Sequence, residues 1–330
     1  MGETTKIAWT DHTFNPWWGC QRVSPGCERC YAETFAKRVG LKVWGPQSER
    51  RFFGDKHWAE PLRWNRKAAA EGRRARVFCA SMADVFEDRE DLREPRARLW
   101  RLISETANLD WLLLTKRPQN AGALARLAAL HAWDGGGPDA PTWLPNIWLG
   151  TTAEDQQRAN ERLPHLLKVP AVVRFVSYEP ALGPVDFTRI VEWERPGPPF
   201  PTAHEFDGLR GFCGATPAED TPAVRGLQWI IVGGESGPSA RPFDAAWARE
   251  TVDQCKAAGV ACFVKQMGSR PYDSNVNASD WPDDARFVGL PEGVPITVAG
   301  AGVKLQHSKG EDPAEWPEDL RVREWPEVRP

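Results

Sequence analysis

The 330-residue sequence lacks any run of 18 consecutive apolar residues, which excludes the usual signature of a transmembrane helix. Residues 1–12 lack the apolar core of a secretory signal peptide. The net charge is only −3, because 42 Lys and Arg nearly balance 45 Asp and Glu. The chain as a whole therefore does not attract nucleic acid, and such a contact needs a local basic patch. We expect a cytoplasmic protein with no membrane partner.

The seven cysteines lack the even, spaced pattern of a disulfide framework. Three of them, Cys20, Cys27 and Cys30, lie within eleven positions as C-x6-C-x2-C. A closed zinc site needs four ligands. No second C-x-x-C or H-x3-5-H pattern follows, and the nearby His12 and His57 do not have motif spacing. The cluster therefore offers three soft ligands without a fourth.

Three explanations of this cysteine cluster remain open. It holds a [4Fe–4S] cluster whose fourth iron is free for a substrate or cofactor, or zinc with a distant fourth ligand, or it supplies structural or redox thiols. Redox chemistry of the thioredoxin type uses two cysteines and leaves Cys20 unexplained. A cluster held by three thiolates uses all three, so we favour it.

Six short apolar runs predict buried strands, at 75–82, 109–116, 146–152, 171–179, 227–235 and 260–266. They do not alternate cleanly, which is typical of parallel strands covered on both faces. Helical patterns accompany them at 27–40, 93–108, 152–169 and 244–259. Thr152 is the expected N-cap of the third helix, and Asp244 and Gly259 are the expected limits of the fourth. This alternation predicts an α/β fold, a TIM-like (β/α) barrel that is complete or partial.

Two segments interrupt the alternation. Residues 186–226 are rich in Pro and Gly and predict a long surface insertion. The chain after residue 267 is irregular and rich in Pro, Asp and Trp. We therefore predict a barrel domain over 1–267 that carries the insertion. An irregular C-terminal extension over 268–330 is expected to pack on the barrel.

Polar residues follow each predicted strand at its end. They are Ser81 and Asp84, Lys116 and Arg117, Thr151, Thr152, Glu154 and Asp155, Ser177 and Glu179, Gly233, Gly234, Glu235 and Ser236, and Lys265 and Gln266. The carboxyl ends of the strands meet on one face of a parallel barrel, so these residues are expected to converge there. Taken singly, each is as well explained as a helix cap or a solvated charge. The glycine pair would let the backbone approach a ligand closely.

Long segments of the chain resemble, in order, a family of phage and prophage proteins that is known for a three-Cys motif and is related to the radical SAM superfamily. The segments are IAWTDHTFNPWWGCQRVSPGCERCYAE, SMADVFED, LLTKRP, IWLGTTAEDQ, RFVSYEPALGPVD, WIIVGGESGPSARP, GVACFVKQMG and RVREWPE. The resemblance covers nearly the whole chain except 188–226 and part of 268–300. The resemblance implies a (β/α) barrel with a [4Fe–4S] cluster after its first strand, S-adenosylmethionine (SAM) as cofactor, an external one-electron donor, and the cytoplasm of a bacterial host.

The resemblance also implies roles for individual residues. Cys20, Cys27 and Cys30 would be the cluster ligands, although radical SAM enzymes usually place three residues, not six, between the first two cysteines. Ser81 and Asp84 stand where that superfamily binds the amino group of SAM. Further cofactor contacts are expected from Glu154, Gly233 and Gly234, and catalytic roles from Lys116, Glu179 and Glu235.

The substrate implied by the phage relatives is a modified nucleobase or nucleic acid, for example in the rearrangement of a hypermodified thymidine. Lys116 and Arg117 would suit a phosphate group. A salt bridge from this pair to Glu154 or Glu179 is the alternative. The competing function is a non-catalytic module that is stabilised by zinc or an iron–sulfur cluster and binds nucleic acid or a protein.

Overall fold

The computed structural model describes residues 5–133, 141–193, 203–211, 225–295 and 299–327. The chain divides into two compact units. Unit 1 consists of Met1–Thr151 and Lys168–Arg174, and unit 2 of Thr152–Leu167 and Phe175–Pro330. In the part of the chain that is described, no helix has both the length and the apolar character needed to cross a membrane.

The main sheet has seven strands in the order in which they occur along the chain, β1-β4-β5-β6-β7-β10-β12. Their bounds are His12–Thr13, Ala75–Cys79, Leu109–Thr115, Ile147–Thr152, Val173–Tyr178, Trp229–Gly233 and Ala261–Gln266. A doubly wound sheet reverses its strand order at a switch point, whereas a (β/α) barrel keeps the order of the chain. The fold is therefore mixed α/β and compatible with a partial (β/α) barrel. All six predicted strands are present.

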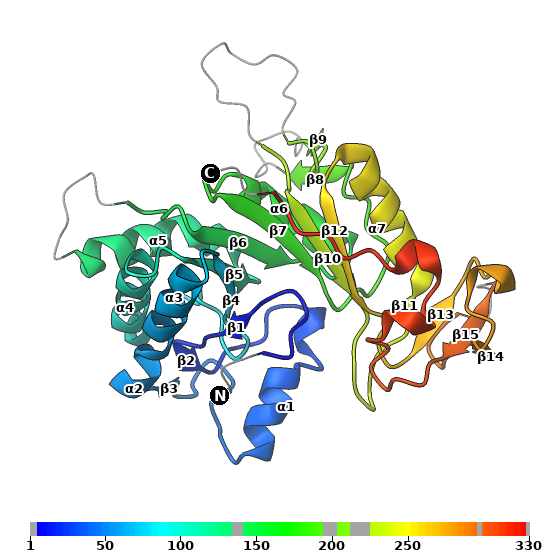
Figure 1. The fold of residues 1–330 in the computed structure, drawn as a ribbon, viewed down its shortest axis with the longest axis horizontal. Coiled ribbons are helices and arrows are strands. Elements are labelled where there is room, and N and C mark those ends of the chain that lie inside the picture. Colours follow the sequence, from blue (N-terminus) through cyan, green and yellow to red (C-terminus); the bar gives the residue numbers. More distant parts are fainter. Residues whose placement is uncertain (1–4, 134–140, 194–202, 212–224, 296–298, 328–330) are drawn as a thin grey trace, which may run out of the picture. The chain divides into compact units, whose positions relative to one another are not determined.

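Unit 1 contains the first parallel strand pairs, with Val77 of β4 opposite both His12 of β1 and Trp111 of β5. Its helices are α1 (Tyr31–Arg38), α2 (Asp55–Trp58), α3 (Glu60–Ala70), α4 (Arg93–Ser104) and α5 (Pro118–Ala132), with the 3₁₀ turns η1 (Pro25–Cys27) and η2 (Glu90–Leu92). Helices α3, α4 and α5 lie beside strands β4 and β5 (Figure 1). Six of the seven residues of β5 are buried, as expected for a strand covered on both faces.

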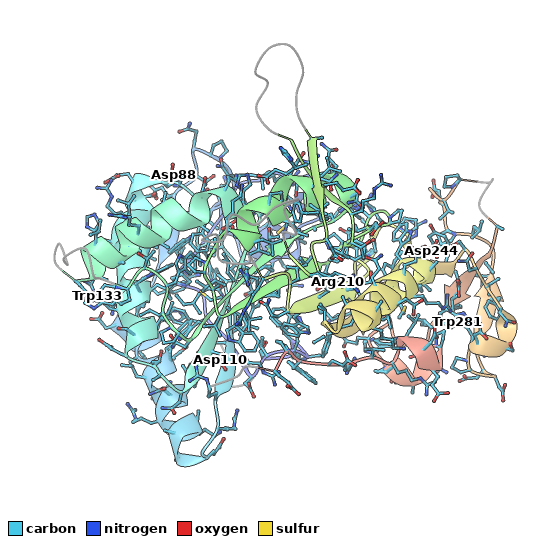
Figure 2. All side chains as sticks on the ribbon, turned by 90° about the horizontal axis from the view of Figure 1, so that it is seen from above. Asp88, Asp110, Trp133, Arg210, Asp244 and Trp281 are labelled. Atoms are coloured by element: carbon cyan, nitrogen blue, oxygen red, sulfur yellow. The ribbon has the colours of Figure 1, made fainter. Side chains whose placement is uncertain are left out.

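Unit 2 contains the parallel pairs of β10 with β7 and β12, and the helices α6 (Gln156–Leu167) and α7 (Ala245–Ala258). The predicted N-cap Thr152 is wrong, because this residue still belongs to β6. Asp155 lies just before α6, and its Oδ1 accepts a hydrogen bond from Arg158 N at 2.8 Å. The limits of α7 are confirmed. Asp244 lies at the start of this helix (Figure 2) and accepts a hydrogen bond from Ala246 N, and Gly259 ends the helix at φ +66°.

The predicted insertion contains a short antiparallel hairpin of β8 (Ile190–Trp193) and β9 (Ala203–Phe206). The amide of Val191 donates to Asn160 Oδ1 of α6 at 3.1 Å, which ties the hairpin to that helix. Residues 194–202 and 212–224 of the insertion lie outside the described residues.

The C-terminal segment is more regular than predicted. A second sheet in the order β11-β13-β15-β14 is formed by Phe243–Asp244, Pro271–Asp273, Ala301–Lys304 and Arg286–Val288. The 3₁₀ turns η3 (Ala278–Asp280), η4 (Pro313–Glu315) and η5 (Glu318–Leu320) connect the remainder. Residues 322–324 run along β12, where Val264 N donates to Val322 O and Glu324 N donates to Cys262 O, each at 2.9 Å. The end of the extension thus forms backbone hydrogen bonds with a strand of the main sheet.

Replacing two glycines by alanine should change stability in opposite directions. Gly259 has φ +66° with no neighbouring atom within 4 Å of an added Cβ, so Gly259→Ala should lower the free energy of unfolding by about 1 kcal/mol through backbone strain alone. Gly122 lies inside α5 with equally open space, so Gly122→Ala should raise it by about 0.5–1 kcal/mol. Urea unfolding measures both, and shifts of the same sign would contradict this explanation.

Candidate functional site

The cysteine loop follows β1, the first strand of unit 1. The backbone on either side of Cys20 is held by two neighbours: Gly19 N donates to Met82 O just after β4, and Gly45 N donates to Cys20 O, both at 2.9 Å. Parallel bridges join Gly19 to Ala83 and Cys20 to Trp44. Cys20 is thus held next to the carboxyl end of β4.

Gly19 is required by close packing. It has φ +121°, and a Cβ at this position would lie 2.4 Å from Val43 O and 2.6 Å from Arg50 Cδ. Both the backbone conformation and the lack of space exclude a larger residue. The glycine before Cys20 is therefore explained by the approach of the 43–50 segment.

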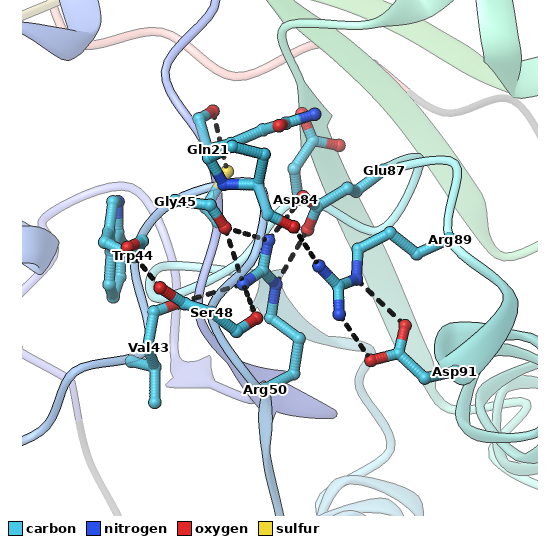
Figure 3. A network of polar contacts seen from close by, with 12 residues as sticks. Gln21, Val43, Trp44, Gly45, Ser48, Arg50, Asp84, Glu87, Arg89 and Asp91 are labelled. Carbon is cyan, nitrogen blue, oxygen red and sulfur yellow. Dashed lines mark hydrogen bonds and ion pairs between the residues drawn. The ribbon is translucent and has the colours of Figure 1, made fainter.

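A buried ion pair, the Arg50–Glu87 clamp, holds that segment (Figure 3). Arg50 Nη2 and Nε donate to the two carboxylate oxygens of Glu87 at 2.6 and 3.1 Å. Arg50 also donates to the carbonyl oxygens of Val43, Ser48 and Gly45. Both side chains are 0% exposed. The pair closes the 43–50 loop around the guanidinium group, and no sequence motif indicated this role.

A second buried pair lies beside Cys20. Arg117 Nη1 donates to Asp84 Oδ2 at 2.7 Å, Arg117 Nη2 donates to Gln21 O at 3.0 Å, and Nη1 lies 3.8 Å from Cys20 Sγ within hydrogen-bonding geometry. Burial raises the pKa of Cys20 to about 12, with the Asp84 charge acting in the same direction and Arg117 opposing it. Burial disfavours the charge of Arg117, but Asp84, Cys20 and Glu87 together outweigh burial and raise the pKa of Arg117. Arg117 thus pairs with Asp84, not with the Glu154 or Glu179 considered above.

The predicted SAM ligands Asp84 and Ser81 already have partners within unit 1. Asp84 Oδ1 accepts from Thr115 Oγ1 at 2.7 Å and from Phe86 N at 3.0 Å, and Oδ2 accepts from Lys116 N at 3.1 Å in addition to Arg117. Ser81 Oγ accepts from Asn15 Nδ2 at 3.1 Å. Asp84 therefore orders the ends of β4 and β5, and its contact with a cofactor stays a prediction.

Cys27 and Cys30 lie further along the cysteine loop, toward α1. Cys27 ends η1 and its Sγ lies 3.8 Å from Ser24 Oγ. Cys30 directly precedes α1, so this helix begins after the cysteines rather than at Cys27. Cys30 packs against a small apolar cluster that includes Ala36 and Met82.

The donor chemistry of the three thiols fits an iron–sulfur cluster, because they are partly exposed and free of disulfides. Their arrangement does not yet form a ligand set. Within the described ranges, no three His, Cys, Asp or Glu side chains are close enough together to hold a metal ion.

Lys116 lies beside this loop at the carboxyl end of β5. Its side chain is half-buried, and its ammonium group has no hydrogen-bonding or ion-pair partner among the residues that the structure describes. A half-buried cation without a counter-charge can bind an anion that enters the site. Of the predicted catalytic residues, Lys116 is the one that unit 1 contains.

The other predicted residues lie in unit 2, where each acid has a basic neighbour. Glu179 accepts from Lys265 Nζ at 2.5 Å, Glu235 pairs with Arg241 at 2.9 Å, and buried Glu154 pairs with Arg162 at 2.7 Å. The glycines support packing between strand ends, since a Cβ on Gly234 would lie 2.6 Å from Met267 O and one on Gly233 would lie 3.1 Å from Gln266 O. The catalytic and cofactor roles of these residues stay predictions.

Removing one partner of the Arg50–Glu87 clamp should be strongly destabilising. Glu87→Gln leaves the Arg50 charge buried and uncompensated, so the free energy of unfolding should fall by about 3–5 kcal/mol. Glu90 has a pair with Arg93 but its side chain is 76% exposed, so Glu90→Gln should cost less than about 1 kcal/mol. Urea unfolding of both variants provides the measurement. A similar small loss in both would show that the clamp does not hold the loop.

Comparison with known proteins identifies the chain at the level of a family. No curated protein and no solved structure matches it. Residues 4–310, which include the cysteine loop and all the candidate residues named above, match the model of one family, described as "Protein of unknown function (DUF5131)". The chain belongs to the DUF5131 family.

Proposed function

We propose that the protein is a radical-SAM-like enzyme that holds a [4Fe–4S] cluster at Cys20, Cys27 and Cys30. The observation that carries this proposal is the position of the cysteine loop. Three free thiols follow the first strand of a sheet whose strands keep chain order, and the backbone at Cys20 is fixed at the end of the second of these strands. A (β/α) barrel builds its active site at this end of its strands.

The three thiolates would provide the ligands, and Arg117 would donate a hydrogen bond to the sulfur of Cys20. Hydrogen bonds to ligand sulfurs are one means by which a protein sets the reduction potential of a cluster. When bound, the cluster would supply one electron, received from an external donor, to cleave SAM and begin radical chemistry on a substrate. The protein's own part is to orient the reactants and exclude water.

Lys116 is the residue of unit 1 best suited to bind an anionic group, such as a carboxylate or phosphate of a cofactor or substrate. Glu179 and Glu235 remain proposed catalytic residues, and Glu154, Gly233 and Gly234 remain proposed cofactor contacts. To bind a ligand, Glu154, Glu179 and Glu235 would each have to break the ion pair with a basic neighbour. A nucleotide or nucleic acid is the proposed substrate class.

Purification without oxygen tests the cluster. We expect a brown protein with broad absorbance near 400 nm and about four irons per chain. Cys27→Ala should lose the iron, whereas Cys255→Ala should keep it, because Cys255 is buried in α7 of unit 2. Equal iron in both variants would refute the ligand assignment. A colourless protein with one tightly bound zinc would instead support the non-catalytic, metal-stabilised binding module.

Incubation of the iron-loaded protein with SAM and dithionite tests the cofactor. The proposal requires release of 5′-deoxyadenosine, and Lys116→Met should reduce this release while the iron content stays unchanged. Methionine has nearly the shape of lysine without its charge. Because Lys116 makes no ion pair in the described part of the chain, this substitution should leave the fold intact. An iron-loaded protein that releases no 5′-deoxyadenosine, with or without nucleotides, would refute the use of SAM.

A further inference from the structure

A row of alternating rings and guanidinium groups lies next to the cysteine loop in unit 1. This aromatic–arginine strip consists of Arg38, Phe35, Trp18, Arg51 and Phe53. Arg38 Cζ lies 5.3 Å from the Phe35 ring centroid, and the Phe35 and Trp18 centroids are 5.9 Å apart. Arg51 Cζ lies 4.9 Å from the Trp18 centroid and 5.4 Å from that of Phe53. The strip thus links α1 with β2 (Trp17–Trp18) and β3 (Arg51–Phe52).

The strip is positively charged and partly accessible, because its rings Trp18, Phe35 and Phe53 are partly buried and its two arginines are exposed. Arg38 and Arg51 are exposed, and neither has a carboxylate partner among the residues that the structure describes. Phe52, beside Arg51, is 46% exposed. Residues 15–67 contain eleven Lys and Arg against five Asp and Glu, although the whole chain has a net charge of −3. The segment that carries the strip is therefore basic, unlike the chain as a whole.

We infer that the aromatic–arginine strip binds single-stranded nucleic acid. Unstacked bases expose faces that pack on aromatic rings and on the flat guanidinium group of arginine, while the N–H groups of the same arginine bind phosphate. An acidic peptide would use the charges but not the ring faces, and a duplex keeps its bases stacked inside. The combination of rings and unpaired arginines therefore favours a single strand.

The strip also adjoins the proposed cluster site, because Trp18 is separated from Cys20 only by Gly19. A strand bound here would place its bases near the cysteine loop. That the strand is the substrate of the cluster chemistry rests on the proposed function, whereas binding itself does not require a metal.

Fluorescence anisotropy with a labelled single-stranded DNA of about twelve nucleotides tests the inference on metal-free and iron-loaded protein. Arg51→Gln should weaken binding about tenfold and reduce the slope of log affinity against log salt by about 0.7. Arg51→Lys keeps the charge, so it should weaken binding while the slope stays unchanged. Arg126→Gln removes an exposed charge from α5 that contacts no ring in the described part of the chain, and it should have little effect.

No binding at low salt, equal loss in Arg51→Gln and Arg126→Gln, or equally tight binding of a duplex would overturn the inference. Competition by polyglutamate as strong as that by unlabelled DNA would assign the strip to an acidic protein partner and would overturn it as well. Iron content of the Arg51→Gln variant is measured in parallel. Strand binding by a protein that holds no iron would support the strip and refute the proposed function alone.

Discussion

The ion pair between Arg50 and Glu87 is the constraint on which the cysteine loop depends. Both side chains are fully buried, so neither charge is solvated and each is stable only beside the other. Arg50 uses its remaining donors on carbonyl oxygens of the 43–48 segment, which fixes that segment. Gly45 then donates to Cys20 O. The position of the first cysteine thus follows from a charge pair that never touches its sulfur.

The three cysteines are consequently unequal. Cys20 is held by strand-end backbone contacts and by Arg117, which is itself anchored on Asp84. Cys27 lies at the end of a 3₁₀ turn, and Cys30 lies immediately before a short helix. In the proposed function, Cys20 would be the ligand whose backbone is held by contacts with Met82 and Gly45.

The sequence was sufficient to predict six of the seven strands of the main sheet and the helices α1, α4, α6 and α7, because apolar runs and cap residues such as Asp244 are local signals. It did not indicate the two-residue strand β1 or the helices α2, α3 and α5. It was less informative for Thr152, which was expected both to end a strand and to cap the following helix. In the structure Thr152 is the last residue of β6, and Asp155 lies just before α6. The contact between Arg50 and Glu87 could not be predicted at all, because 36 residues lie between them in the sequence. The polar residues do follow the strands as predicted, but Asp84 and Glu154 are paired with Arg117 and Arg162 inside the protein. Composition cannot show whether a carboxylate is already paired.

Arg50 and Arg51 are adjacent in an extended segment, yet one side chain is buried and the other is exposed. Successive residues of an extended chain point to opposite sides. Arg50 turns inward to Glu87, and Arg51, the next residue, lies over the rings of Trp18 and Phe53. Trp18 in turn pairs with Arg51 across β2 and β3 and is followed by Gly19 and Cys20. The clamp that fixes the first cysteine therefore also fixes the strip, so a ligand on one is positioned relative to the other by the same backbone.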